Sequence, residues 1–392
     1  MTNEVDRRNF LKAAGAGLSA AGLALTGAAP VTAAEQTNAP ATSQAAAQAA
    51  TDKNLLLRIA ACSYPIRSIF KTRGAGGGGG GQTAALKQKY GEITMLDFPQ
   101  FTKDTFPGVT HMDIYSALFG DVTDDTMFAA RAGGGIGTFD PMSPSGRKWL
   151  DKLAANQTKL GVKTQHISNN APTNLAAYGS PEQDALRKAG VDIAKRWLEG
   201  CAVLGVKSMR MNSPQALGPS IRPNALTPQE QQAKGLRGDG YVRNFDIVPL
   251  MSAAIESYKE MADFGGNLGI RVTFENHWGL AADPMNIRIM LDTINHPYCE
   301  ASPDFCNWEH EYMLFNGLKA LAPYSHTNVH AKYWDRWGDK NDVQRSTRIM
   351  LAGGFKGTFA LEYEAGPLNG IEGAQYLYKE VLAALSSPTP VV

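Results

Sequence analysis

Four residues that can bind a divalent cation follow one another through the last third of the chain, each at the end of a short apolar run. They are Glu275 in Val-Thr-Phe-Glu-Asn-His, Asp304 in Ser-Pro-Asp-Phe, His330 in Asn-Val-His-Ala-Lys and Glu362 in Ala-Leu-Glu-Tyr-Glu. A single acidic residue after a strand usually caps a helix or is solvated. Four in succession, each separated from the next by roughly 30 residues, the length of one strand-helix unit, instead indicate a shared site.

The ligand types indicate which metal such a site would prefer. Three carboxylates and one imidazole form a mostly oxygen set, which suits one Mn²⁺, Mg²⁺ or Co²⁺ ion and leaves Zn²⁺ as an alternative. No thiolate belongs to the set, so it is not typical of a structural zinc site.

The elements that must position these residues alternate between short apolar strands and longer segments of helical period. We expect eight strands, at 58–62, 109–115, 162–168, 206–212, 271–275, 299–303, 326–330 and 358–362. We expect eight helices, at 84–105, 145–160, 181–203, 247–265, 284–294, 310–322, 341–352 and 370–385. Eight such units predict an α/β fold, a (β/α)₈ TIM barrel, in which the carboxyl ends of the strands converge above the core. An open doubly wound sheet is less favoured, because no Gly-x-Gly-x-x-Gly follows the first strand.

Three insertions follow strands on the side where barrel active sites form. The first contains the glycine run 76–81, which we expect to be a tether rather than a phosphate loop, because no Gly-Lys-Ser/Thr follows. The second spans about 116–144 and the third 213–245, and both are expected to be loops. A lid and an oligomer contact are both open roles for them.

The N-terminal segment is predicted to be a targeting signal. Residues 1–34 carry Arg7-Arg8 before a mildly apolar Ala/Gly/Leu stretch and resemble a twin-arginine export signal. Residues 35–53 are expected to be a flexible linker, and 54–388 a single barrel domain. The signal implies contact with the Tat export machinery, no stable membrane insertion after processing, and a periplasmic or secreted protein that leaves the cytoplasm already folded.

Composition excludes several classes. The formal net charge of +1 argues against a nucleic-acid partner, and four cysteines in 392 residues argue against a disulfide-dense mini-domain. The cysteines lie in or beside apolar runs, so we expect buried thiols, with a Cys299–Cys306 bridge as the open alternative.

The motifs resemble those of the xylose isomerase-like TIM barrels, specifically the sugar phosphate isomerase/epimerase group. The resemblance covers about residues 55–385 and is strongest in Phe-Glu-Asn-His, Pro-Asp, Val-His-Ala-Lys and Leu-Glu-Tyr-Glu. It implies that Glu275, Asp304, His330 and Glu362 bind the metal and that Glu275 and Glu362 are the acid–base pair. Family members often have a His three residues after the metal Asp, where this chain has Asn307, which cannot act as an acid or base.

The expected reaction is proton transfer through an enediolate. The expected substrate is a free or oxidised sugar, because phosphorylated sugars are scarce outside the cytoplasm. The residues expected to contact this carbohydrate are His277, Asn307, Lys332, Arg336, His166 and Arg210. Trp278, Trp334 and Trp337 lie near the same rim.

Three alternatives stay open. A lyase or dehydratase would use the same site to eliminate from a keto-sugar or a 3-keto-glycoside, and is the closest competitor. A sugar-binding barrel without catalysis predicts that one of the paired glutamates is lost, and both are present. An apurinic-site endonuclease would bring more His and Glu ligands and a basic face. A homo-oligomer is expected by analogy only.

Overall fold

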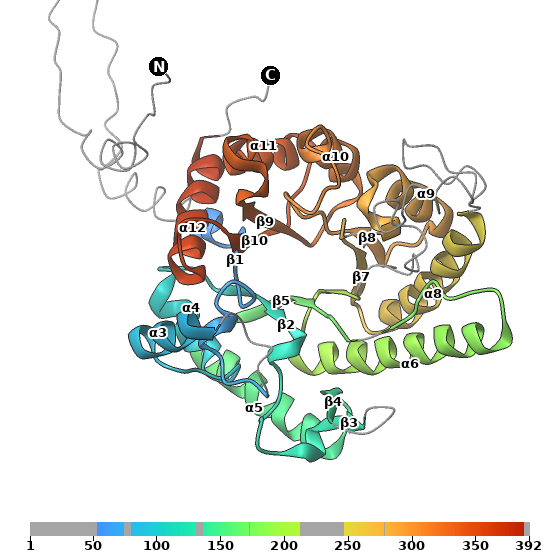
Figure 1. Cartoon of the computed structure of the whole chain (residues 1–392), viewed down its shortest axis with the longest axis horizontal. Coiled ribbons are helices and arrows are strands. Elements are labelled where there is room, and N and C mark those ends of the chain that lie inside the picture. The colour runs from blue at the N-terminus through green and yellow to red at the C-terminus, as the bar shows by residue number, and fades with distance from the viewer. Residues whose placement is uncertain are drawn as a thin grey trace, which may run out of the picture. The chain divides into compact units, whose positions relative to one another are not determined.

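Eight parallel strands form one sheet that curls around a central axis (Figure 1). The computed structural model describes residues 53–73, 80–130, 136–171, 173–211, 247–277 and 279–387. The strands in order around the sheet are β8 (Cys299–Ala301), β7 (Arg271–Phe274), β6 (Ser208–Arg210), β5 (Lys163–Ser168), β2 (His111–Tyr115), β1 (Ile59–Cys62), β10 (Thr358–Ala365) and β9 (Asn328–Trp334). All eight predicted strands are confirmed.

The sheet closes between its first and last strands. Just beyond β8, the His330 amide donates a hydrogen bond to the Pro303 carbonyl at 3.1 Å, and the Phe305 amide donates to the His330 carbonyl at 3.1 Å. These bonds form a parallel bridge between Asp304 and His330. The predicted TIM barrel is confirmed, and the bridge that closes it contains two of the predicted metal ligands.

The helices lie outside the strands (Figure 1). They are α4 (Phe98–Thr105), α5 (Pro144–Leu160), α6 (Pro181–Leu204), α8 (Val248–Asn267), α9 (Pro284–Ile294), α10 (Met313–Leu321), α11 (Val343–Ala352) and α12 (Gly370–Ser386), with α3 (Gly80–Tyr90) as an extra helix. Ser143 and Ser180 cap α5 and α6 by accepting hydrogen bonds from backbone amides of the first turn. Gly161 and Gly205 end the same two helices with φ of +67°, a left-handed conformation that glycine adopts readily.

The prediction of one helix over 84–105 is wrong, because the chain breaks there into α3 and α4. Gly91 has φ of +82°, outside the helical region. The next residues form a bridge in which the Lys71 amide donates to the Ile93 carbonyl at 2.8 Å. Pro99 lies in the first turn of α4, where a proline needs no backbone N–H, and it could not lie inside one continuous helix without disrupting it. The other seven predicted helices are confirmed, with ends that differ by a few residues.

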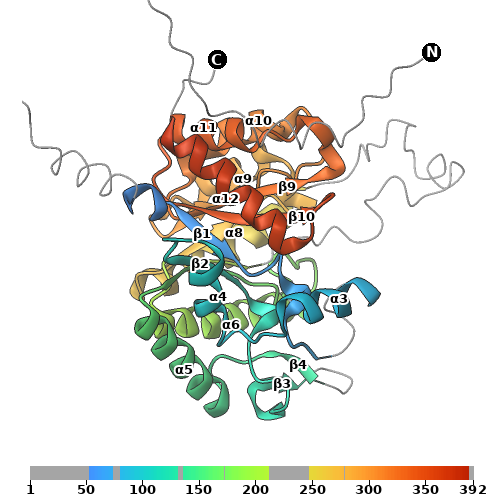
Figure 2. The ribbon, with the colours of Figure 1, turned by 90° about the vertical axis from the view of Figure 1, so that its left-hand side faces the viewer.

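The second insertion is more regular than the loop we predicted. It contains an antiparallel hairpin of β3 (Phe128–Ala130) and β4 (Ile136–Phe139). The Phe139 ring lies 5.2 Å from Trp149 on α5 and 5.8 Å from Trp197 on α6, measured between centroids. Figures 1 and 2 show the hairpin beside α5, on the opposite side of the barrel from α10 and α11. The segment is ordered by aromatic side chains on helices that follow it in the chain, so the residue pattern of the segment alone does not predict the hairpin.

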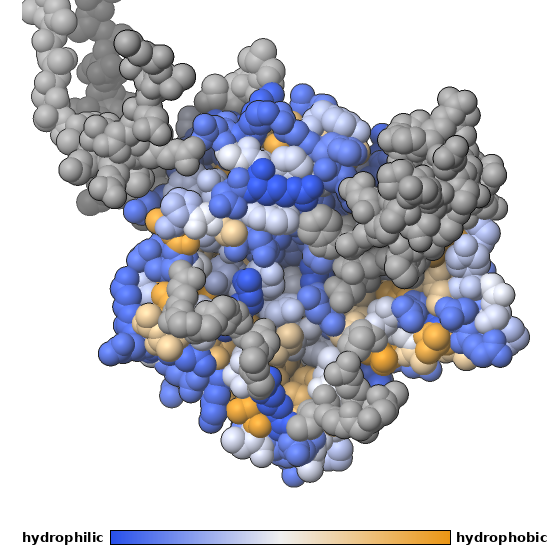
Figure 3. All heavy atoms as spheres, viewed as in Figure 1, coloured by the Kyte–Doolittle hydropathy of each residue, from blue (hydrophilic) through white to orange (hydrophobic). Residues whose placement is uncertain are grey.

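Several sequence predictions lie outside the described residues. They are the export signal 1–34, all but residue 53 of the linker, most of the glycine run 76–81, the insertion 213–245 and Trp278. Within the described residues, no helix is long and apolar enough to cross a membrane. The four cysteines are free thiols, so the Cys299–Cys306 bridge is not formed. On the face shown in Figure 3, hydrophobic residues lie scattered among hydrophilic ones.

Glu300 on β8 is a buried acid outside the predicted site. Its side chain is 1% exposed, it accepts a hydrogen bond from the Thr327 amide at 3.0 Å, and it lies 3.2 Å from the Arg271 guanidinium. Burial raises the pKa of Glu300 from 4.5 to about 7, against the opposing effects of Thr327 and Arg271.

This raised pKa predicts that Glu300 makes the protein less stable as the pH rises. Between pH 4.5 and about 7 the folded state binds a proton that the unfolded state has lost, so the stability falls across this window. Glu300→Gln imitates the protonated acid at every pH. From pH 5 to pH 8 we expect the wild type to lose about 2–3 kcal/mol of unfolding free energy relative to the variant, measured by urea denaturation. A constant difference between the two proteins at both pH values would contradict the buried-acid assignment.

Candidate metal centre and acid–base site

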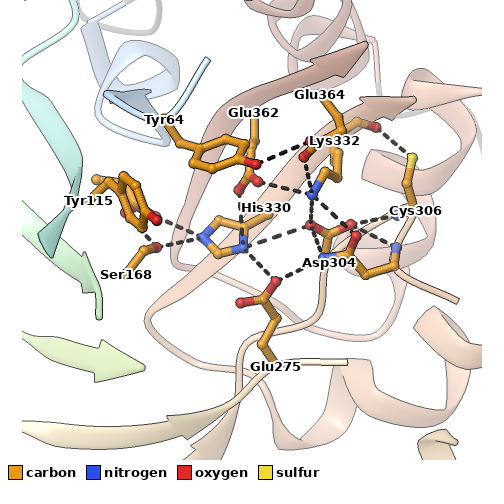
Figure 4. Close-up of polar contacts among 12 residues, drawn as sticks. Tyr64, Tyr115, Ser168, Glu275, Asp304, Cys306, His330, Lys332, Glu362 and Glu364 are labelled. Atoms are coloured by element: carbon orange, nitrogen blue, oxygen red, sulfur yellow. Dashed lines mark hydrogen bonds and ion pairs between the residues drawn. The ribbon is translucent and has the colours of Figure 1, made fainter. Parts of the chain in front are cut away.

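Three carboxylates converge on one imidazole nitrogen at the carboxyl ends of the last strands (Figure 4). Nδ1 of His330 lies 3.5 Å from Glu275 Oε1, 3.5 Å from Glu362 Oε2 and 4.0 Å from Asp304 Oδ2. His330 and Glu362 lie on β9 and β10. Glu275 directly follows β7, and Asp304 lies three residues beyond the end of β8. The four residues are between 0% and 7% exposed. The structure therefore brings all four predicted ligands together.

The donor atoms fit a divalent cation. Among the described residues, His330 Nδ1 is buried without a hydrogen-bond partner, although buried nitrogens are normally paired. Each neighbouring carboxylate oxygen is at or beyond the limit of hydrogen bonding, yet all three surround this nitrogen. Donor atoms of Glu275, Asp304 and His330 lie within 4.8 Å of one another. This mixed oxygen and nitrogen set suits Mg²⁺ or Mn²⁺, and Glu275, Asp304, His330 and Glu362 would hold the ion.

The other imidazole nitrogen is fixed from behind by Asp113 on β2. His330 Nε2 lies 2.9 Å from Asp113 Oδ2 and 3.2 Å from Ser168 Oγ. Asp113 in turn accepts hydrogen bonds from Asn328 Nδ2 at 2.8 Å and Ser168 Oγ at 2.9 Å. A carboxylate on the far nitrogen sets the orientation of a ligating histidine, and with Nε2 protonated it leaves Nδ1 free for a metal. Asp113 is not among the predicted site residues, and its only signal in the sequence is a lone carboxylate inside the strand His111–Tyr115.

Arg210 holds Glu275 in its charged form. The Arg210 guanidinium donates to Glu275 Oε2 and also to Asn170 Oδ1. Burial opposes ionisation, but the charges of Arg210 and His330 outweigh it and hold the pKa of Glu275 well below its usual range. The Glu275 carboxylate raises the pKa of Arg210 against its burial. Glu275 is therefore ionised at neutral pH and can accept a proton from a substrate.

Lys332 is the cation on the other side of the centre. Its Nζ lies 3.0 Å from Glu362 Oε1, 3.2 Å from Asp304 Oδ2 and 3.1 Å from Glu364 Oε2. These carboxylates raise the pKa of Lys332 well above its ordinary value, although burial acts in the opposite direction. Burial, with the charges of Glu362 and Glu275, raises the pKa of Asp304 to about 7 despite Lys332.

Asn307 connects the two halves of the centre. Its Nδ2 donates to Glu275 Oε1 and to Asp304 Oδ2, both at 3.0 Å, and its Oδ1 accepts from Lys332 Nζ at 3.2 Å. We predicted Asn307 as a substrate contact in place of a histidine. In the structure its amide is engaged with three protein groups and orients two of the predicted ligands.

Of the other residues predicted to contact the substrate, His277 and His166 lie near the centre and Arg336 does not. His277 is partly exposed near Glu275, and burial lowers its pKa to about 4. His166 lies on the Asp113 side of His330, its ring centroid 6.0 Å from that of His330, and burial lowers its pKa to about 4. Both imidazoles are therefore uncharged at neutral pH. Arg336 is not brought to the centre: it is exposed, lies over Trp337 and donates to the Glu309 carbonyl at 3.3 Å.

Glu364 and Tyr64, which were also not predicted, form a hydrogen-bonded pair beside Glu362. Glu364, two residues along β10 and therefore on the same face of the strand, accepts a hydrogen bond from the Tyr64 hydroxyl at 3.1 Å. The alternation in Leu-Glu-Tyr-Glu was the signal for Glu364. Tyr64 follows β1, almost 300 residues earlier in the chain, and nothing local in the sequence indicates its place.

No protein-family model and no curated protein sequence matches this chain. Solved structures do share its fold. They include a xylose isomerase-like TIM barrel protein from Mycobacterium smegmatis in complex with magnesium, at 16% identity and a TM-score of 0.50, covering 84% of this chain and 98% of that one. L-Ribulose 3-epimerase has 12% identity and a TM-score of 0.50, covering 84% of this chain and 94% of that one. D-Allulose 3-epimerase from Methylomonas sp. has 11% identity and a TM-score of 0.52, covering 85% and 98% respectively. At these identities the similarity shows the fold of the xylose isomerase-like TIM barrels and nothing further.

The position of Asp113 predicts its effect on metal affinity. Asp113→Asn removes the charge that orients His330 while keeping the side-chain shape, so we expect Mn²⁺ affinity to fall by roughly 10- to 100-fold. Isothermal titration of the folded, metal-free proteins measures this. Glu300→Gln, a buried acid-to-amide change on β8 outside the centre, is the matched control and should keep wild-type affinity. Equal affinities for Asp113→Asn and wild type would show that Asp113 does not position a ligand.

Proposed function

We propose that this protein is a divalent-metal-dependent sugar isomerase or epimerase that transfers a proton between Glu275 and Glu362. The observation that supports this most directly is the position of the two carboxylates. Each lies 3.5 Å from His330 Nδ1, and Figure 4 shows them on opposite sides of the imidazole. Two carboxylates that face each other across a metal site can reach both faces of a planar intermediate between them.

The roles follow from the surroundings of each carboxylate. A bound cation would polarise the substrate carbonyl and stabilise the charge of the enediolate. Glu275, kept ionised by Arg210, removes the proton from the carbon next to the carbonyl. Glu362, held by Lys332 at 3.0 Å, gives a different proton from the other side while Glu275 keeps the one it removed, so the two glutamates exchange the roles of acid and base in each turnover. Return to the opposite face of the same carbon gives epimerisation, and return to the neighbouring carbon gives aldose–ketose isomerisation.

Elimination is the second candidate, and the Tyr64–Glu364 pair favours it specifically. The Tyr64 hydroxyl is hydrogen-bonded to Glu364, which shares Lys332 with Glu362. A hydroxyl beside the acid–base pair could protonate an oxygen that leaves from the carbon β to the carbonyl. The same enediolate would then lose water or a sugar, which is a lyase or dehydratase reaction on a keto-sugar or 3-keto-glycoside.

The remaining parts of the proposal rest on the sequence and on the structural neighbours. Two neighbours are named as sugar 3-epimerases and one contains magnesium, which supports a carbohydrate substrate and Mg²⁺, Mn²⁺ or Co²⁺ as the cofactor. Arg7-Arg8 supports export by the Tat machinery to the periplasm or the medium. A free or oxidised sugar is therefore the expected substrate class.

Replacing either glutamate tests the proton transfer. Glu275→Gln and Glu362→Gln each remove a proton acceptor while keeping the shape of the side chain, so we expect deuterium exchange to fall at least 100-fold in each. The metal-loaded proteins are incubated in D₂O with a panel of ketoses, aldoses and 3-keto-glycosides and followed by NMR. Glu300→Gln serves as the control and should exchange at the wild-type rate.

The products in the same experiment separate the two candidate reactions. Deuterium next to a carbonyl together with an epimer or isomer supports the isomerase, whereas deuterium with release of water or a sugar supports the lyase. Wild-type exchange in either glutamine variant would refute the acid–base assignment.

A further inference from the structure

A cavity of about 550 Å³ opens beside the metal centre, a size typical of small-molecule sites. Its walls come from the segments after β1, β2 and β5 and from the β3–β4 hairpin. It therefore lies over the carboxyl ends of the strands, on the same side of the barrel as the four predicted ligands.

Three residues of the cavity wall lie between the cavity and the centre. Tyr64 lines the cavity and donates to Glu364, whose carboxylate contacts Lys332. Asn170 lines the cavity and accepts from Arg210, which holds Glu275. Tyr115 stands between them, its ring edge-on to Tyr64 and its hydroxyl bonded to Asn170 at 3.0 Å. Hydrogen bonds therefore connect the cavity wall to Glu364 on one side and, through Arg210, to Glu275 on the other.

Aromatic rings and guanidinium groups form much of the cavity wall. The Arg67 guanidinium lies 3.9 Å from the centre of the Tyr64 ring, and the Arg73 guanidinium lies 4.1 Å from the centre of the Phe128 ring. Further rings of the hairpin and α6 complete the lining. Aromatic and guanidinium planes both favour stacking against another planar group.

Several polar groups of the lining are engaged within the protein. Ser116 Oγ accepts from the Asn170 backbone amide at 2.8 Å. Arg67 donates to the Tyr64 carbonyl at 2.9 Å, and Arg73 pairs with Asp125 at 2.6 Å. The polar residues Lys71, Thr72 and Thr138 also line the cavity. The flat side chains of the wall, rather than its polar groups, therefore favour an aromatic occupant.

We propose that this cavity is a subsite for an aromatic aglycone, so that the natural substrate is an aryl glycoside in its keto form rather than a free monosaccharide. The assignment of the sugar half to the metal centre rests on the function proposed above. The assignment of the aglycone half rests on the cavity alone. Placing the aglycone against Tyr64 puts the glycosidic oxygen on the side of the Tyr64–Glu364 pair.

Binding of unreactive glycosides tests the subsite without requiring turnover. The probes are methyl glucoside and phenyl glucoside, each in both anomeric forms, and cellobiose, titrated calorimetrically into the Mg²⁺-loaded protein. For at least one anomer we expect phenyl glucoside to bind at least tenfold more tightly than methyl glucoside and more tightly than cellobiose.

A variant of Ala117 locates the effect. Ala117 lines the cavity, is exposed and contributes nothing to the metal centre. Ala117→Trp should fill the cavity and reduce the phenyl-to-methyl affinity ratio to about one, leaving methyl glucoside affinity unchanged. Ala117→Ser is the matched control and should retain the wild-type ratio.

The following binding results overturn the proposal. Equal affinities for the phenyl and methyl glucosides, or no binding of phenyl glucoside at millimolar concentration, would show that the cavity is not an aglycone site. Cellobiose binding at least as tightly as phenyl glucoside would assign the cavity to a sugar ring. An unchanged ratio in Ala117→Trp would place the phenyl group elsewhere. Loss of deuterium exchange with this binding preference intact would refute only the proposed reaction.

Discussion

Three carboxylates, those of Glu275, Asp304 and Glu362, are buried within 4.0 Å of one imidazole nitrogen, and such a cluster of like charges is stable only when positive charge is buried with it. The protein supplies part of that charge through Arg210 and Lys332. His330 supplies the remaining positive charge when its imidazole is protonated. Burial lowers the pKa of His330, but the surrounding carboxylates outweigh this and raise it well above its ordinary value. A divalent cation at His330 Nδ1 would take the place of that proton, so metal and proton compete for one position.

The barrel supplies the rigidity that this arrangement requires. Asp304 and His330 are joined by the backbone bridge that closes the sheet, so the separation of two ligands is set by main-chain hydrogen bonds. Asp113, from the opposite part of the sheet, fixes the orientation of the His330 ring across the barrel interior. Asn307 then ties the Asp304 carboxylate to that of Glu275. The geometry of the centre is thus a consequence of barrel closure rather than of loop conformation.

This dependence explains what the sequence predicted well. Each of the four predicted ligands follows or ends an apolar run, namely Glu275, Asp304, His330 and Glu362. The end of a strand can be recognised from its neighbouring residues, so the spacing of the four along the chain was enough to predict a shared site. Asp113, Tyr64 and the β3–β4 hairpin owe their places to partners far away in the chain, which spacing does not record. The helix predicted over 84–105 was wrong because the turn at Gly91 and the bridge of Ile93 to the loop after β1 outweighed helical periodicity. Arg336 was expected to contact the substrate, but it lies in the short helix after β9, is exposed and stacks on Trp337.

Anomalous X-ray scattering from crystals of the Mn²⁺-loaded protein would locate the divalent cation that we place on the Nδ1 side of His330. We expect a single anomalous peak in contact with Glu275, Asp304, His330 Nδ1 and Glu362. The buried group Asp113, His166 and His330 offers a competing cluster of donor atoms on the Nε2 side. A peak at that cluster alone, or no peak at saturating Mn²⁺, would show that no divalent cation binds on the Nδ1 side of His330.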